Sequence, residues 1–115
     1  MLPKIHRLNR QKDFDAIFQR GALAQDIFLA IRFLPNQQKI SRFGFIISAK
    51  VAKRAVERNR LRRQLGEAIR AHLKKISPKL DFILIVKTKL IGASYEEIEG
   101  ILISLLKKKK LYAGQ

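Results

Sequence analysis

The sequence contains no cysteine and no tryptophan, and only nine of its 115 residues are acidic. The lack of cysteine excludes a disulfide scaffold, a thiol nucleophile and a zinc site with thiolate ligands, and it suits a reducing cytoplasm. No uninterrupted apolar run reaches about 18 residues, so no membrane span is expected. Residues 1–10 lack the apolar core of a secretory signal. We therefore expect a cytoplasmic protein without a membrane association.

Positive charge is abundant: 25 Lys and Arg residues give a formal net charge of +16. Hydrophobic residues still make up 47% of the chain, which is enough for a folded core. The length predicts one domain over residues 1–115. A folded protein with this charge indicates a polyanionic partner, with nucleic acid as the first candidate and an anionic membrane surface as the second.

Apolar residues recur at helical spacing in three segments, which predicts helices over 10–20, 50–76 and 95–110. Gly21 is well placed to end the first helix, and Ser94 with Glu97 forms a capping-box pattern at the start of the last.

Strands are predicted over 27–34, 42–48 and 81–87, the last as a continuous apolar run buried on both faces. The loop between the first two strands is short, so we expect them to pair as a hairpin. Gly44, inside the second strand, suggests a bulge or a close backbone approach. The order α-β-β-α-β-α predicts a small α+β sandwich.

The densest chemical signal is a basic segment over residues 50–63. In the following part of the helix Leu65, Ile69 and Leu73 share one face, and continuing that face backwards reaches Arg62 and Arg58. Since a buried unpaired guanidinium is costly, the start of the helix must leave the core and border a solvated groove or an anion. A phosphate backbone would justify the like charges, because each neutralised phosphate releases counterions. The candidate RNA-binding residues are Lys50, Lys53, Arg54, Arg58, Asn59, Arg60, Arg62 and Arg63.

The remaining polar residues offer no sign of intrinsic catalysis. His6 and His72 are far apart without metal-ligand spacing, and His72 is expected to be a hydrogen-bonded residue at the core boundary. The acidic residues are scattered, so we predict no catalytic residue and no protein metal site. Residues 107–110 are all lysine, and both a favourable interaction with the helix dipole and contact with phosphates remain open for them.

The run over residues 53–63, KRAVERNRLRR, resembles the signature helix of the bacterial ribonuclease P protein subunit. Segments flanking it agree in order and spacing, so the resemblance covers nearly the whole chain. The matching features are Arg7-Leu8, Asp13-Phe14 with Phe18 and Gly21, the segments 44–50 and 81–87, and Leu111-Tyr112. Gly66 departs from the basic residue that many relatives carry, and Ile31 occupies a position that can be aromatic.

The resemblance implies an α-β-β-β-α-β-α sandwich with a four-stranded sheet and a left-handed βαβ crossover, similar to the second domain of ribosomal protein S5. It also implies an accessory subunit of ribonuclease P, in which a large RNA subunit holds the Mg²⁺ ions and cleaves precursor tRNA at the mature 5′ end. The protein would bind that RNA and the single-stranded 5′ leader, with no obligate protein partner.

The resemblance also implies a leader-binding cleft between the first helix and the sheet. Aromatic side chains there would suit single-stranded RNA, although the apolar members could equally be core. The candidate cleft residues are Phe14, Phe18, Leu29, Ile31, Ile46, Ser48 and, by resemblance, Tyr112.

Three other functions compete with this interpretation. A ribosomal or general basic RNA-binding protein fits the charge and size equally well, but not the ordered set of motifs. A protein-only ribonuclease would need a metal or acid–base cluster, and a helix-turn-helix DNA-binding protein would not contain this strand pattern.

Overall fold

The computed structural model describes residues 2–113. Its order is α-β-β-β-α-β-α, as the resemblance implies. The helices are α1 (Gln11–Arg20), α2 (Ala55–His72) and α3 (Tyr95–Lys108), with short 3₁₀ turns η1 (Lys4–His6), η2 (Leu73–Lys75) and η3 (Thr88–Leu90). The strands are β1 (Ala22–Gln25), β2 (Leu29–Pro35), β3 (Arg42–Ile46) and β4 (Leu80–Val86).

The four strands form one mixed sheet in the order β1-β2-β4-β3. Strand β4 pairs antiparallel with β2 and parallel with β3, so it lies between the two strands expected to form a hairpin, and that expectation is wrong. The hairpin partner of β2 is instead β1. With only four residues, β1 is too short to show a strand periodicity in the sequence.

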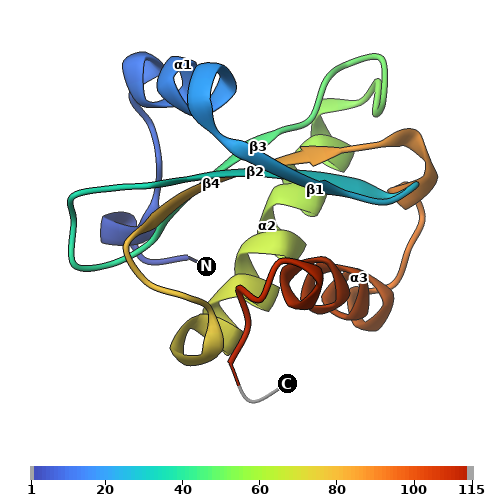
Figure 1. Ribbon diagram of the computed structural model, residues 1–115. Helices are drawn as coiled ribbons and strands as arrows, with labels where there is room; N and C mark the ends of the chain where they lie inside the picture. Colours follow the sequence, from blue (N-terminus) through green and yellow to red (C-terminus); the bar gives the residue numbers. More distant parts are fainter. Residues whose placement is uncertain (1, 114–115) are drawn as a thin grey trace.

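Helix α1 covers one face of the sheet, and α2 and α3 cover the other (Figure 1). Side chains along β4 alternate between the two faces of the sheet and contribute to a hydrophobic core on each. Phe82 and Leu84 belong to the larger core beneath α2 and α3. Ile83 joins Leu8 and Ile17 in the smaller core beneath α1. The smaller core contains fewer buried residues than the larger core. Side chains on the α1 side of the sheet are therefore less deeply covered, and Phe14 on this side contributes to the candidate site.

Helix α2 begins at Ala55, five residues later than predicted. The Ser48 carbonyl accepts hydrogen bonds from the backbone N–H groups of Val51 and Ala52, which closes a turn instead of a helix. Arg54 then has extended dihedral angles as the N-cap. Lys50, Lys53 and Arg54 therefore precede the helix.

The other end of α2 follows the predicted hydrophobic face. Leu61, Leu65, Ala68 and Ile69 are buried, and the chain passes through η2 to Ile76, whose dihedral angles are extended. Helix α3 begins with the predicted capping box: the Glu97 N–H donates to Ser94 Oγ and the Ser94 N–H donates to Glu97 Oε1. No helix within residues 2–113 has the length and apolarity to cross a membrane.

Candidate nucleic-acid interface

A groove with a volume of about 610 Å³ lies between the N-terminal segment, β3 and α2. Its apolar wall contains Phe14, Phe43 and Phe45, and its polar edge contains cationic side chains from two parts of the chain. The remaining lining residues are Leu2, Lys4, Arg7, Leu8, Asn9, Gly44, Asn59, Arg62, Arg63 and Gly66. Aromatic faces beside a cationic edge suit a single-stranded nucleic acid, whose bases stack while its phosphates need positive charge.

The geometry of α2 explains why its arginines reach this groove. The helical face that buries Leu65 and Ile69 also contains Arg62 one turn earlier, where the groove leaves the side chain exposed. Arg62 and Arg63 are exposed at the groove, and Arg62 Nη1 donates to Asn59 Oδ1 at 3.1 Å. The prediction that the start of the helix borders a solvated groove is confirmed.

Phe14 reaches the groove because Gly44 has no side chain. A Cβ atom added at Gly44 would lie 2.5 Å from Phe14 Cζ, so the phenyl ring packs directly on the β3 backbone. This is the close backbone approach that the sequence suggested for Gly44. A glycine in a strand is unfavourable by itself, so the contact with the ring offsets part of that cost.

An ionic contact fixes α1 against the sheet beside Phe14. Arg42 donates to both carboxylate oxygens of Asp81, from Nε at 2.9 Å and from Nη2 at 2.7 Å. Its Nη1 lies 3.7 Å from Asp13 Oδ2 on α1. The hydrogen bond to Asp81 raises the pKa of the Arg42 guanidinium, so this group stays charged. Arg42 thereby joins α1, β3 and β4 at one corner of the groove.

The N-terminal segment supplies groove residues that the sequence did not reveal. The Leu8 N–H donates to the Phe43 carbonyl at 2.8 Å, and a His6 ring nitrogen lies 2.7 Å from the Ser41 carbonyl oxygen. These contacts hold Lys4, Arg7 and Asn9 at the edge of the groove. Residues 1–10 have no hydrophobic periodicity, so the signals in this segment are its basic composition and the match of Arg7-Leu8 to the family.

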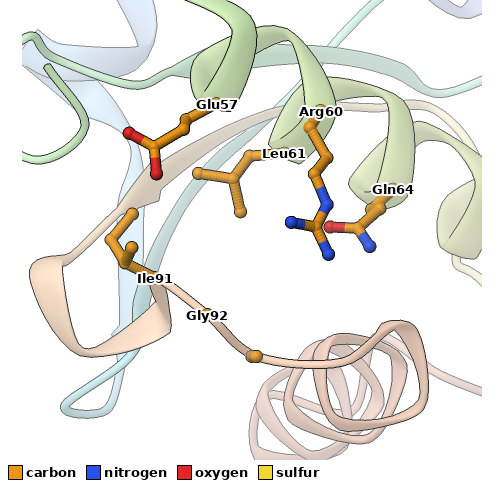
Figure 2. A pocket seen from close by; sticks show the side chains of 7 residues that line it. Glu57, Arg60, Leu61, Gln64, Ile91 and Gly92 are labelled. Atoms are coloured by element: carbon orange, nitrogen blue, oxygen red, sulfur yellow. The ribbon is translucent and has the colours of Figure 1, made fainter. Parts of the chain in front are cut away.

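The remaining basic residues near the start of α2 have different surroundings. Arg58 Nη1 donates to the carbonyls of Ala52 and Lys53 at 2.8 and 2.9 Å, and thus stabilises the turn before the helix. Arg60 points away from the groove into a small cavity of about 30 Å³ between α2 and the segment 91–93 (Figure 2). Lys50, Lys53 and Arg54 are exposed in the turn. The basic groups therefore lie in three places: at the groove, on another side of α2 and in the turn that precedes this helix.

Three of the predicted cleft residues lie on the wrong side of the sheet. Leu29 and Ile31 are 0% and 1% exposed in the larger core, because their β2 side chains point toward α2 and α3. Tyr112 also packs against that core, and its hydroxyl lies 2.7 Å from His72 Nδ1. The expectation that they share a cleft with Phe14 is wrong. For Leu29 and Ile31 the reason is that strand alternation does not show which face α1 covers, whereas Tyr112 is placed in the cleft by the resemblance alone.

Two of the other predicted cleft residues, Phe18 and Ile46, stay on the α1 side. Phe18 is 42% exposed, with the Arg32 guanidinium carbon 5.5 Å from its ring centroid. Ile46 packs beside the smaller core, and Ser48 is exposed after β3. None of the three lines the 610 Å³ groove. Phe18 and Ile46 lie on the same side of the sheet as Phe14, beyond the groove.

The second histidine has the surroundings expected from the sequence. His72 Nε2 lies 2.8 Å from Glu99 Oε2, so both ring nitrogens have partners at the edge of the core. Within residues 2–113 no cluster of three or more His, Asp or Glu side chains could hold a metal ion.

Comparisons with known proteins agree with the geometry. The Ribonuclease P family model matches residues 2–110. The ribonuclease P protein component of Rippkaea orientalis is 39% identical over 118 residues, which cover 98% of this chain and 93% of the relative. That of Alkaliphilus oremlandii is 35% identical over 107 residues and covers 93% of each chain.

Solved structures show the same fold. The RNase P protein from Thermotoga maritima has a TM-score of 0.82 at 28% identity, covering 89% of this chain and 96% of that chain. The Staphylococcus aureus RNase P protein has a TM-score of 0.86 at 24% identity, covering 93% and 97%. The chain therefore belongs to the ribonuclease P protein component family.

Proposed function

We propose that this ribonuclease P component binds two RNAs, the catalytic RNA subunit and the single-stranded 5′ leader of precursor tRNA. By holding both, it aids the endonucleolytic removal of the leader. The observation that carries the proposal is the groove that Phe14 lines together with Arg62, Arg63 and Asn59.

The groove suits the leader because it combines the two recognition elements of single-stranded RNA. Phe14 and Phe45 offer aromatic surface, and stacking on such a surface contributes about 1–3 kcal/mol per base without demanding a sequence. Arg62 and Arg63 present guanidinium forks that match phosphate oxygens in pairs. A double helix cannot present unstacked bases in this way, so the groove favours an unpaired segment.

The opposite flank of α2 suits the RNA subunit. Arg60 is exposed on that flank (Figure 2), and Lys53 and Arg54 are exposed in the turn before the helix, so these cations can contact a phosphate backbone while the groove holds the leader. Arg58 supports this surface by binding the turn that contains Lys53, and its other donors remain available to phosphates. Two separate surfaces on one helix would bring the two RNAs together.

Cleavage itself belongs, in this proposal, to the RNA subunit with its Mg²⁺ ions. Bound magnesium supplies charge neutralisation and an activated water for phosphodiester hydrolysis. The acidic side chains within residues 2–113 do not fit a magnesium site, because no group of three or more could hold a metal ion and two of them, Asp81 and Glu99, are engaged by Arg42 and His72. The protein acts by binding and positioning RNA in the cytoplasm.

The test is precursor-tRNA cleavage at low magnesium with the RNA subunit alone, the protein alone, and both together. The proposal predicts cleavage at the mature 5′ end only when both are present. Cleavage by the protein alone would reveal an active site in the protein and contradict it. No stimulation of a cognate, competent RNA would instead favour a general or ribosomal RNA-binding role.

A further inference from the structure

A second basic surface lies at the opposite end of α2 from the groove. The C-terminal ends of α2 and α3 meet there, at the bottom of the view in Figure 1. The Ser77 N–H donates to the Leu111 carbonyl and the Ala113 N–H to the Lys75 carbonyl, which holds the two segments together. We call this surface the lysine end; its exposed members are Lys74, Lys75, Lys79, Lys107, Lys108, Lys109 and Lys110.

Helix dipoles do not account for this amount of charge. Each helix C-terminus carries about half a negative charge, so two of them together attract about one cation. Residues 68–80 and 100–113 contain seven lysines and no Asp or Glu. Lys107 Nζ also lies 5.6 Å from the Tyr112 ring centroid, so about five positive charges remain without a compensating partner in these segments, and they repel one another. Folding stability alone does not favour this arrangement.

The backbone conformation of two lysines in this surface is also unfavourable for folding stability. Lys79 and Lys110 have φ angles of 66° and 58°, and they are the only non-glycine residues with positive φ within residues 2–113. Lys110 occupies the position after the α3 C-cap where glycine is usual: the Leu111 N–H donates to the Leu106 carbonyl and the Lys110 N–H to the Lys107 carbonyl. Position 110 thus carries a charged side chain, although glycine would adopt this conformation at a lower cost in free energy. This indicates that the charge has a function.

We infer that the lysine end binds an RNA phosphate backbone, as a second contact in addition to those of the proposed function. Eleven residues separate Arg63 at the groove from Lys74 at the lysine end, which corresponds to about 16 Å of helix and exceeds the Debye length of about 8 Å at physiological ionic strength. The lysine end and the groove therefore act on different phosphates. Lysine ammonium groups act as point charges, so this contact does not depend on a fixed phosphate geometry.

RNA fits this surface better than an anionic membrane. A helix that binds in a lipid interface needs exposed apolar side chains to insert. The exposed large hydrophobic residues of the described chain are Ile5, Phe18, Ile27 and Val56, and none of them lies at the lysine end. The ligand is the phosphate backbone of either the RNA subunit or precursor tRNA.

The first test removes charge at the lysine end and at a matched control site. Binding of the full chain is measured against salt concentration for the ribonuclease P RNA, for precursor tRNA and for vesicles of anionic phospholipid. Lys108→Gln with Lys109→Gln lowers the slope of log affinity against log salt by about two for one of the RNAs, and its affinity at about 0.1 M salt about tenfold. The control, Lys12→Gln with Lys89→Gln, removes the same charge outside both basic regions and changes the slope by less than one.

Comparing the two RNAs and the vesicles shows which of them supplies the bound phosphates and whether the inference holds. A loss confined to one of the two RNAs identifies that RNA as the partner. Equal losses in the two double variants, or a loss of vesicle binding with both RNAs unaffected, would overturn the inference. If the protein fails to stimulate cleavage but the lysine variant still loses RNA affinity, the proposed function fails while this inference stands.

A second test uses the backbone of Lys110. Lys110→Gly relieves the left-handed conformation, so it raises the melting temperature while it weakens RNA binding severalfold. A lysine with a purely structural role would not change the two quantities in opposite directions. A variant with unchanged RNA affinity would contradict a phosphate contact at this residue.

Discussion

The two ends of α2 are both strongly basic, but they differ in composition and surroundings. Five of the seven basic residues in segment 50–63 are arginine, and part of that segment borders an aromatic groove. All seven basic residues of the lysine end are lysine. Forked, planar guanidinium groups suit phosphates at fixed positions, whereas ammonium groups tolerate many arrangements. Similar net charge can therefore indicate a specific contact at one end and a diffuse contact at the other.

The largest effect is expected from removing the arginines at the groove. Arg62→Ala with Arg63→Ala should lower affinity for leader-bearing precursor tRNA about a hundredfold, because each lost charged hydrogen bond costs about 1.5–3 kcal/mol. Equilibrium binding to the reconstituted holoenzyme measures this change. Arg10→Ala with Arg20→Ala serves as the control with the same loss of charge. Equal losses in the two variants would show that net charge, not the groove, determines substrate binding.

Exchanging arginine and lysine tests whether the groove and the lysine end bind phosphates in different ways. Arg62→Lys with Arg63→Lys keeps the charge but removes the guanidinium forks, so we expect about a tenfold loss of affinity for the same substrate. Lys108→Arg with Lys109→Arg should change the affinity less than twofold. The same assay compares the variants, and a larger effect at the lysine end would reverse our assignment of the two contacts.

A smaller loss of affinity for leader-bearing tRNA is expected when the Phe14 ring is displaced or removed. Gly44→Ala would displace the Phe14 ring, and Phe14→Ala would remove it. Each should weaken binding of leader-bearing tRNA about fivefold to tenfold, as expected for the loss of one base stack, and leave mature tRNA unaffected. Because both changes act on one contact, the double variant should lose little more than either single variant. Equal losses for precursor and mature tRNA would remove Phe14 from the leader site.

The smallest effect concerns Gly66, a groove residue in the middle of α2. A Cβ atom added there would lie 3.7 Å from the nearest atoms of Leu2, at ordinary van der Waals distance. Gly66→Ala should therefore raise the free energy of unfolding by up to about 1 kcal/mol, measured by urea denaturation, with RNA affinity unchanged. Destabilisation would mean that the N-terminal segment cannot accommodate a methyl group.

The sequence predicted the parts of the fold that depend on local pattern. Helical periodicity gave α1 and α3 nearly to the residue, and the capping box at Ser94 formed as expected. Pairing of the strands could not be predicted locally, because β2 pairs with a strand about 50 residues later. The resemblance to a family supplied the four-stranded sheet that periodicity did not reveal.

The candidate site could be predicted from charge but not from strand alternation. Arg62 was assigned to a groove because a guanidinium on the core face cannot be buried unpaired, and the structure confirms this placement. Leu29 and Ile31 were misplaced because alternation shows which residues share a face but not which helix covers it. Arg7 and Asn9 were missed because their position depends on a bridge to β3.

The central claim, that the groove holds the leader, is tested most directly by photo-crosslinking. A photoreactive phenylalanine analogue at Phe14 is compared with the same analogue at Ile27, an exposed residue in the turn between β1 and β2, in the holoenzyme with precursor tRNA. The account predicts crosslinks from position 14 to leader nucleotides and none to the leader from position 27. Crosslinks from position 14 only to the mature tRNA body, or equal leader crosslinks from both positions, would contradict it.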